Sequence, residues 1–200
     1  MASYTAVYPT AHSTTYVKAT SKQAGGEFEP HMATNPALSL IGVPNTKSWR
    51  TSSRTNQRFH IDLGSSKIVR RIYYQNYHES GTDSARGAEN FTFQGSNTRA
   101  GSFDDLVYAN NGGWTNLTIA QSKLDRHSAA NASDPKYILV TNAVAYRYYA
   151  FKIADNWGDV NWLGLRHIAL MTEDGYPPPS GNFFIFFSQA YKKNKEHFKK

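Results

Sequence analysis

Two polar segments of the sequence carry the side chains best suited to binding a hydroxyl-rich ligand. The first segment, residues 77–86, contains Tyr77, His78, Glu79 and Arg86. Ligand hydroxyls need both hydrogen-bond donors and acceptors, and an aromatic ring can pack on the apolar C–H face of such a ligand. The three polar side chains could supply the hydrogen bonds and the tyrosine the ring. The alternative is an ordinary solvated loop, because loops are polar whether or not they bind anything.

The second segment, residues 155–162, places two tryptophans among asparagine, aspartate and glycine. Exposed indole rings are unfavourable unless they bind something, so Trp157 could be a stacking platform, or it could plug the end of the fold. Trp162 precedes Leu163, and we expect it to pack inward. The candidate ligand-binding residues of this segment are therefore Asn156, Trp157 and Asp159.

Residues that could support catalysis form no recognisable set. The sequence contains no nucleophile elbow, no His-Glu-x-x-His motif and no phosphate-binding glycine-rich loop. Asp104 and Asp105 are adjacent, so in a strand their carboxylates would point to opposite faces. There is no cysteine, which excludes thiolate chemistry and disulfides. The sequence therefore predicts no enzymatic activity.

Short β-strands must position these segments. Phe59, Ile61 and Leu63 alternate with His60 and Asp62, which predicts a half-buried strand ending at Gly64. Further strands are predicted at residues 68–74, 91–95, 106–108, 117–119, 137–140, 146–153 and 165–171, with one or two before residue 44. Almost no segment has helical periodicity, so we predict an all-β, antiparallel jelly-roll β-sandwich.

The alternating pattern also predicts a core. Its expected members are Phe59, Ile61, Leu63, Phe91, Phe93, Phe151 and Ile153. Asp62 and Arg147 lie beside these apolar positions, where they could either pair with each other or face the solvent.

The C-terminal part of the sequence differs from the rest. We divide the chain into a sandwich domain (1–174), a Pro/Gly linker (175–181) and a hydrophobic, then basic, tail (182–200). The tail could fold back on the sandwich or dock on another subunit. Its last ten residues hold five lysines and one glutamate, so they carry +4 of the net charge of +7. Because the basic excess is confined to a tail, we expect no nucleic-acid partner, and we expect no membrane partner either.

Several sequence stretches, in this order, resemble the coagulation factor 5/8 type C (discoidin-like) domains. They are residues 49–53, 57–65, 91–97, 147–153 and 163–170, and the resemblance spans about residues 30–172. It implies a galactose-binding-like sandwich, a fold used in that family mainly to bind sugars, cell surfaces or phospholipid headgroups. The corresponding region of carbohydrate-binding members often carries a histidine and an arginine, as His78 and Arg86 do here.

The resemblance also bears on metal binding, because many members of this family hold a structural Ca²⁺ between an early loop and a late acidic residue. Here Asn35 stands where an aspartate is common, and His167 stands at the late position that is usually glutamate. Calcium prefers several charged oxygen ligands, so these replacements weaken the expectation of an ion. Asn35 is the predicted side-chain ligand if Ca²⁺ binds, and we expect no other cofactor.

Two functional hypotheses follow from the sequence. The first is a binding module that recognises carbohydrate, such as a cell-surface glycan, through loops at one end of the sandwich. The second is a structural virion protein, such as a phage head or tail decoration protein, whose tail assembles with other virion subunits or forms a homo-oligomer. Residues 1–20 lack the apolar core of a signal peptide. A virion and an extracellular surface are both compatible locations, and the sequence identifies neither the sugar nor the oligomeric state.

Overall fold

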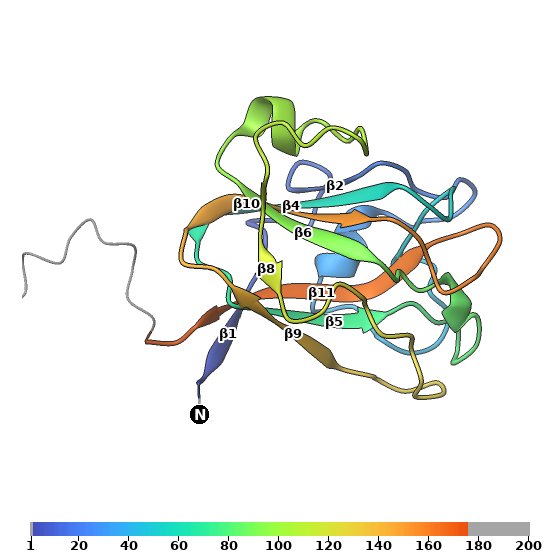
Figure 1. Cartoon of the computed structure of the whole chain (residues 1–200). Coiled ribbons are helices and arrows are strands. Elements are labelled where there is room, and N and C mark those ends of the chain that lie inside the picture. Colours follow the sequence, from blue (N-terminus) through green and yellow to red (C-terminus); the bar gives the residue numbers. More distant parts are fainter. Residues whose placement is uncertain (1, 176–200) are drawn as a thin grey trace, which may run out of the picture.

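Two antiparallel sheets face each other in the computed structural model, which describes residues 2–175 apart from the side chain of Ala100 (Figure 1). One sheet has the order β1 (Tyr4–Val7), β11 (Gly164–Glu173), β5 (Arg71–Asn76), β9 (Lys136–Thr141), β8 (Thr118–Ile119), with β3 (Trp49–Arg50) also pairing with β11. The other sheet has the order β2 (Val17–Ala19), β4 (Gln57–Lys67), β10 (Tyr146–Ile153), β6 (Phe91–Ser96), β7 (Thr115–Asn116). The described helices are the short segments η1 (Pro30–Thr34), η2 (Ser84–Arg86) and η3 (Arg99–Phe103). The predicted all-β sandwich is confirmed.

Aromatic and branched side chains fill the space between the sheets, as their period-two spacing requires. Phe59 of β4 lies opposite Phe151 of β10, which in turn lies opposite Phe93 of β6. The centroids of the Phe93 and Phe151 rings are 4.8 Å apart, and Trp49 contacts Phe59 at 4.9 Å. All seven predicted core residues are buried members of this cluster.

The prediction that Gly64 ends a strand was wrong. β4 continues through Gly64 to Lys67, and the next strand begins at Arg71. Gly64 has φ +75°, and the register between β4 and β10 shifts over the same stretch, so the glycine forms a bulge within the strand. A Cβ atom at this position would lie 2.2 Å from Oγ1 of Thr10. The glycine therefore permits the close approach of the N-terminal loop.

The outer face of the second sheet is covered, which the alternating sequence pattern did not predict. His60 and Asp62 are both completely buried rather than half-exposed. The segment 97–114, which includes η3, lies over this face (Figure 1). Its Trp114 packs on the His60 ring at 4.8 Å, and the main-chain oxygen of Phe103 lies 3.0 Å from Nδ1 of His60. Residues 106–108 belong to this covering segment and do not form the predicted strand.

Asp62 and Arg147 form the ion pair that the sequence left as one of two alternatives. Nε and Nη2 of Arg147 donate to the two oxygens of Asp62 at 2.8 and 2.9 Å. Oδ1 of Asp62 also accepts a hydrogen bond from the Gly64 backbone at 2.7 Å. These bonds satisfy a fully buried carboxylate and fix the bulge of β4.

Beyond β11, the greater part of the predicted linker and the whole of the predicted tail lie outside the described residues. Within residues 2–175, no helix is long and apolar enough to span a membrane.

Candidate functional site

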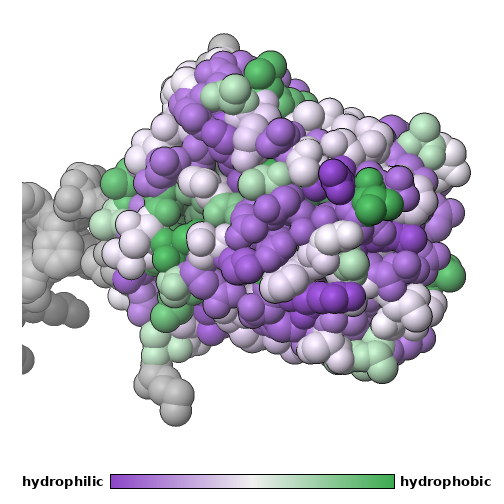
Figure 2. Space-filling view, turned by 45° about the vertical axis from the view of Figure 1, so that its right-hand side comes forward, coloured by the Kyte–Doolittle hydropathy of each residue, from purple (hydrophilic) through white to green (hydrophobic). Residues whose placement is uncertain are grey.

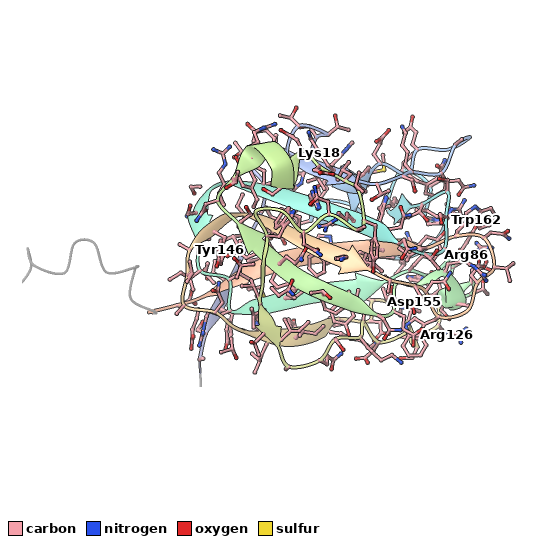
Figure 3. The ribbon with its side chains drawn as sticks, turned by 45° about the horizontal axis from the view of Figure 1, so that its top comes forward. Lys18, Arg86, Arg126, Tyr146, Asp155 and Trp162 are labelled. Atoms are coloured by element: carbon pink, nitrogen blue, oxygen red, sulfur yellow. The ribbon has the colours of Figure 1, made fainter. Side chains whose placement is uncertain are left out.

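The two segments singled out from the sequence meet at one end of the sandwich. Residues 77–89 follow β5, and residues 154–163 connect β10 to β11; together we call them the loop rim. Trp157 N–H donates to the Gly87 carbonyl at 3.1 Å, and Asp159 N–H donates to the Ala85 carbonyl at 3.3 Å. Figure 3 shows Arg86, Asp155 and Trp162 together at this end. The expected clustering of the two segments is thus present in the structure.

Buried contacts beneath the rim hold the two loops together. Asn76, at the end of β5, donates through Nδ2 to the carbonyls of Ala88 and Asp125 at 2.8 and 2.9 Å. Its side chain passes so close to Gly87 that a Cβ atom there would lie 2.7 Å from Oδ1. Gly164 begins β11 with a similar restriction, because a Cβ atom would lie 2.5 Å from the Tyr77 ring. Glycines at these two positions let the loops approach each other.

Arg86 connects the loops electrostatically. Its Nε contacts Asp159 at 3.2 Å, Nη1 contacts Glu79 at 3.0 Å and Nη2 contacts Asp83 at 3.1 Å. The guanidinium carbon also lies 4.6 Å from the centroid of the Trp162 ring. Partial burial would lower the pKa of Arg86. The surrounding carboxylates, of which Asp83 has the largest effect, outweigh burial and raise the pKa. Arg86 therefore organises the rim through contacts within the protein.

Arg50 is a second organising residue, and it was not predicted. It reaches the rim from β3 and donates through Nη1 to the Tyr77 hydroxyl at 2.8 Å. Its guanidinium carbon lies 4.0 Å from the Phe28 ring centroid and 4.7 Å from that of Trp162. The signal in the sequence was an arginine directly after Trp49, a buried tryptophan. Trp162 is half-buried beside both arginines, in agreement with the expectation that it packs inward.

Tyr77 and Asn156 are buried, so neither side chain lies at the surface of the rim, where their predicted role in ligand binding would place them. Tyr77 is completely buried, so its ring has no free face. Asn156 is also buried, and its Nδ2 donates to the carbonyls of Asp159 and Trp162 at 2.9 and 2.6 Å. Both side chains have partners inside the protein: Asn156 pairs with the loop's own backbone, and the Tyr77 hydroxyl accepts a hydrogen bond from Arg50.

His78 is turned inward as well. Its ring stacks on His127, with 3.8 Å between the ring centroids, and its Nε2 lies 2.8 Å from the Leu40 carbonyl. The Gly81 N–H donates to Nδ1 of His78 at 3.0 Å, so Nδ1 is an acceptor and Nε2 carries the proton. Burial, together with His127, lowers the pKa of His78 to about 4. At neutral pH the ring is uncharged and supports the first turn of the loop.

Glu79, Asp83 and Trp157 present groups to the outside of the rim. Glu79 and Asp83 have side chains that are 36% and 39% exposed. Trp157 is half-buried; its indole N–H donates to the Leu124 carbonyl at 2.9 Å, and the Lys123 ammonium lies 4.9 Å from its ring centroid. Asp159 accepts hydrogen bonds from the backbone N–H groups of Asn161 and Trp162. Partial burial would raise the pKa of Asp159, but these two bonds and the hydrogen bond from Arg86 outweigh burial and lower the pKa.

The residues at the predicted metal position do not fit a calcium ion. Oδ1 of Asn35 accepts the Ala37 N–H at 3.0 Å, which makes it part of a local turn. His167 is buried, and burial and the neighbouring His12 lower its pKa to about 4. An uncharged imidazole is a poor substitute for the carboxylate that Ca²⁺ prefers. Across residues 2–175, no group of three or more His, Cys, Asp or Glu side chains could hold a metal ion.

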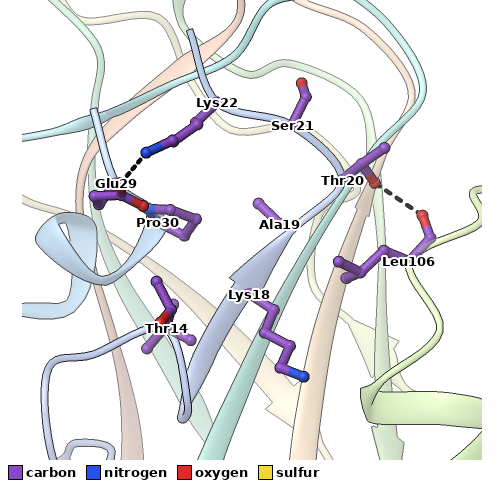
Figure 4. Close-up of a pocket in the computed structure, with 10 residues that line it drawn as sticks. Thr14, Lys18, Ala19, Thr20, Ser21, Lys22, Glu29, Pro30 and Leu106 are labelled. Atoms are coloured by element: carbon purple, nitrogen blue, oxygen red, sulfur yellow. Dashed lines mark hydrogen bonds and ion pairs between the residues drawn. The ribbon is translucent and has the colours of Figure 1, made fainter. Parts of the chain in front are cut away.

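Two grooves lie beside β2, away from the loop rim. The first, of about 350 Å³, runs between Lys18–Lys22 on one side and Glu29 and Pro30 on the other (Figure 4). The second, of about 710 Å³, shares Thr20 and Leu106 with it. None of the seven predicted ligand-binding residues lines either groove. Figure 2 turns the rim end forward and shows hydrophilic residues over most of the visible surface, broken by small hydrophobic patches.

Comparison with known proteins identifies the fold. No protein-family model and no curated protein matches the sequence. The CBM32 of AlyQ, solved with 4,5-unsaturated mannuronic acid, has a TM-score of 0.52 and 16% identity over 83% of this chain and 97% of that chain. The family 32 module of NanJ from C. perfringens, solved with galactose, has a TM-score of 0.51 and 13% identity over 85% of this chain and 100% of that chain.

A third solved structure is a variant of chitosan-binding module 1 from a chitosanase/glucanase of Paenibacillus sp. IK-5. Its TM-score is 0.51, with 18% identity over 78% of this chain and 92% of that chain. At these identities the comparisons establish the fold alone. The galactose-binding-like jelly roll expected from the sequence is confirmed, and the chain has the fold of the family 32 carbohydrate-binding modules.

Proposed function

We propose that this chain is a non-catalytic module that recognises carbohydrate, such as a cell-surface glycan, through the loop rim. The observation that carries the proposal is the position of Glu79, Asp83 and Trp157, which present exposed carboxylate oxygens and part of an indole ring at one end of the sandwich. Carboxylates accept hydrogen bonds from sugar hydroxyls, and an indole ring packs on the C–H face of a pyranose. The fold shared with carbohydrate-binding modules supports the proposal by analogy.

The electrostatics of the rim are suited to binding hydrogen-bond donors. The lowered pKa of Asp159 keeps this carboxyl ionised at neutral pH, so its oxygens are hydrogen-bond acceptors. Arg86 contacts Asp159, Glu79 and Asp83 together and restricts all three to one arrangement. A fixed set of acceptors is suited to recognising one pattern of hydroxyl groups.

The virion hypothesis gains no support from the three solved structures. Its argument depended on the C-terminal tail, which lies outside the described residues, so it stays a prediction from the sequence.

A glycan array tests the proposed function. We expect reproducible binding to a small group of glycans by the intact chain, and loss of that binding in Trp157→Ala. Trp114→Ala is the matched control, because Trp114 is also a half-buried tryptophan but packs on His60, away from the rim. Both variants are checked for the native fold by circular dichroism. Glycan binding that survives Trp157→Ala, or no binding to any glycan, would contradict the proposal.

A further inference from the structure

The fold leaves the charge of the ligand open. The three modules compared above are named with a uronic acid, with galactose and with chitosan, which are an anionic, a neutral and a cationic sugar. The charged groups of this chain's own rim must therefore decide which class it accepts.

The arginines at the centre of the rim hold most of their donors against partners within the protein. Each of the three guanidinium nitrogens of Arg86 contacts a carboxylate, and the side chain is only 15% exposed. Arg50 is 10% exposed, donates through Nη1 to Tyr77 and Glu79, and donates through Nε to Gln23. Among residues 2–175, Nη2 of Arg50 has no hydrogen-bond partner. A sugar carboxylate that approached Nε or Nη1 of either arginine would have to displace these internal partners, which would leave carboxylates such as Glu79 unpaired.

Acceptors, in contrast, remain open. Both arginines contact Oε2 of Glu79, whereas its Oε1 has no hydrogen-bond partner among residues 2–175. Within the described part of the chain, Oδ2 of Asp83 accepts a hydrogen bond only from the Thr82 hydroxyl, at 3.3 Å. The rim therefore offers carboxylate oxygens to a ligand that donates hydrogen bonds, and the strongest such donor on a sugar is a protonated amine.

The net charge of the side chains around the rim is negative, like that of the open acceptors. Although the sequence before the tail has a net charge of +3, carboxylates outnumber cations around the two loops. The carboxylates are Glu79, Asp83, Glu89, Asp125, Asp155 and Asp159; the cations are Arg50, Arg86, Lys123, Arg126 and the buried Arg166. The surroundings of the rim thus carry one more carboxylate than cations, whereas the rest of the sequence before the tail is net basic.

Arg126 is an exposed cation beside the loop rim that pairs with no carboxylate among residues 2–175. Its Nε donates to the Ser84 hydroxyl at 2.9 Å, and its side chain is exposed. In Figure 3 it lies beyond Asp155, away from Arg86 and Trp162. A single exposed arginine beside Asp125 is worth little to an anionic ligand, because water screens such pairs.

We propose that the loop rim selects sugars that carry a free, protonated amine, with Glu79 Oε1 as the acceptor of the ammonium group, and that it rejects uronic acids. This inference rests on the proposed function and makes it more specific. Neutral sugars are bound through the same acceptors but more weakly, since a hydroxyl forms a weaker hydrogen bond to a carboxylate than an ammonium does.

Isothermal titration calorimetry on the full chain tests the selection with three tetramers: β-1,4-glucosamine, its N-acetylated counterpart and mannuronate. A pH of about 5.5 keeps the sugar amine protonated. We expect the glucosamine tetramer to bind most tightly, the N-acetylated tetramer about fivefold or more weakly, and the mannuronate tetramer undetectably. The preference for the amine should shrink at high salt, because the rim is exposed.

Variants assign the effect to its residue. Glu79→Gln should weaken binding of the glucosamine tetramer about fivefold. It should weaken binding of the N-acetylated tetramer by a smaller factor, because the glutamine carbonyl still accepts a hydroxyl. Asp174→Asn is the control, because Asp174 follows β11 at the end opposite to Gly164 and bonds to Thr5. If mannuronate bound as tightly as glucosamine, the proposed preference for amines would be wrong, although carbohydrate binding itself would stand. Loss of that mannuronate binding in Arg126→Gln would assign it to Arg126. Equal binding of the two glucosamine tetramers would also show the preference for amines to be wrong. Failure of every sugar here and on the array would overturn the proposed function itself.

Discussion

Replacement of Arg86 by methionine tests whether this residue joins the two loops. Methionine keeps an unbranched side chain over Trp162 and removes the three carboxylate contacts of 3.0–3.2 Å. The contact with Asp159, whose side chain is 16% exposed, should contribute about 1.5–3 kcal/mol as a charged hydrogen bond. Glu79 and Asp83 are more than one-third exposed, so their contacts should contribute about 0.2–1 kcal/mol each. We therefore expect Arg86→Met to lower the free energy of unfolding by about 2–5 kcal/mol.

Urea denaturation followed by tryptophan fluorescence measures this loss. Arg86→Lys keeps the charge but cannot reach three carboxylates at once, so it should recover less than half of the stability. Arg99→Met is the matched control. Arg99 contacts Asp104 at 3.2 Å and the buried Asp62 at 3.7 Å, but its side chain is 44% exposed and Asp62 keeps its bidentate partner Arg147, so its loss should cost about 0.5 kcal/mol or less. If Arg86→Met were as mild as Arg99→Met, Arg86 would not hold the rim together, and the structural basis of the proposed site would be wrong.

Three further predictions concern the scaffold of the rim and the covered sheet. Gly164→Ala should lower the melting temperature and cost about 1–3 kcal/mol, because its Cβ would lie 2.5 Å from the buried Tyr77 ring. His78 has a folded-state pKa of about 4 against an ordinary value of 6.5, so the unfolded chain takes up this proton first. The contribution of the uncharged His78 to stability should be complete above pH 6.5 and be lost as the pH falls towards 4. In a His78→Asn variant, the urea denaturation midpoint should therefore depend less on pH over this range. Arg147→Met should cost about 1–3 kcal/mol in urea denaturation, because it leaves the buried Asp62 without its bidentate partner.

The sequence predicted the sandwich well because period-two alternation reports directly on which residues face the core. Phe59, Phe93 and Phe151 were assigned to the core for this reason and are buried. The pattern failed where local and long-range structure compete. Gly64 has the residue type of a strand end, yet in the structure it forms a bulge that fits against Thr10, a contact between distant parts of the sequence.

The site was predicted only at the level of segments. Composition identified the two loops, but it could not separate residues that face a ligand from residues that satisfy the loop itself. Tyr77, His78 and Asn156 are polar or amphipathic, as ligand-binding residues are, and all three are buried in contacts within the protein. Arg50 was missed because its role depends on tertiary placement: β3 brings it beneath the rim from a distant part of the chain.

Amide chemical-shift mapping with the tightest-binding glycan tests most directly whether the loop rim is the binding face. The predicted result is a shift of the Trp157 indole N–H signal and of the Glu79 and Asp83 amides, with the Trp114 indole unchanged. Shifts confined to the grooves beside β2, at residues such as Lys18 and Thr20, would show that the glycan binds elsewhere and would contradict the account.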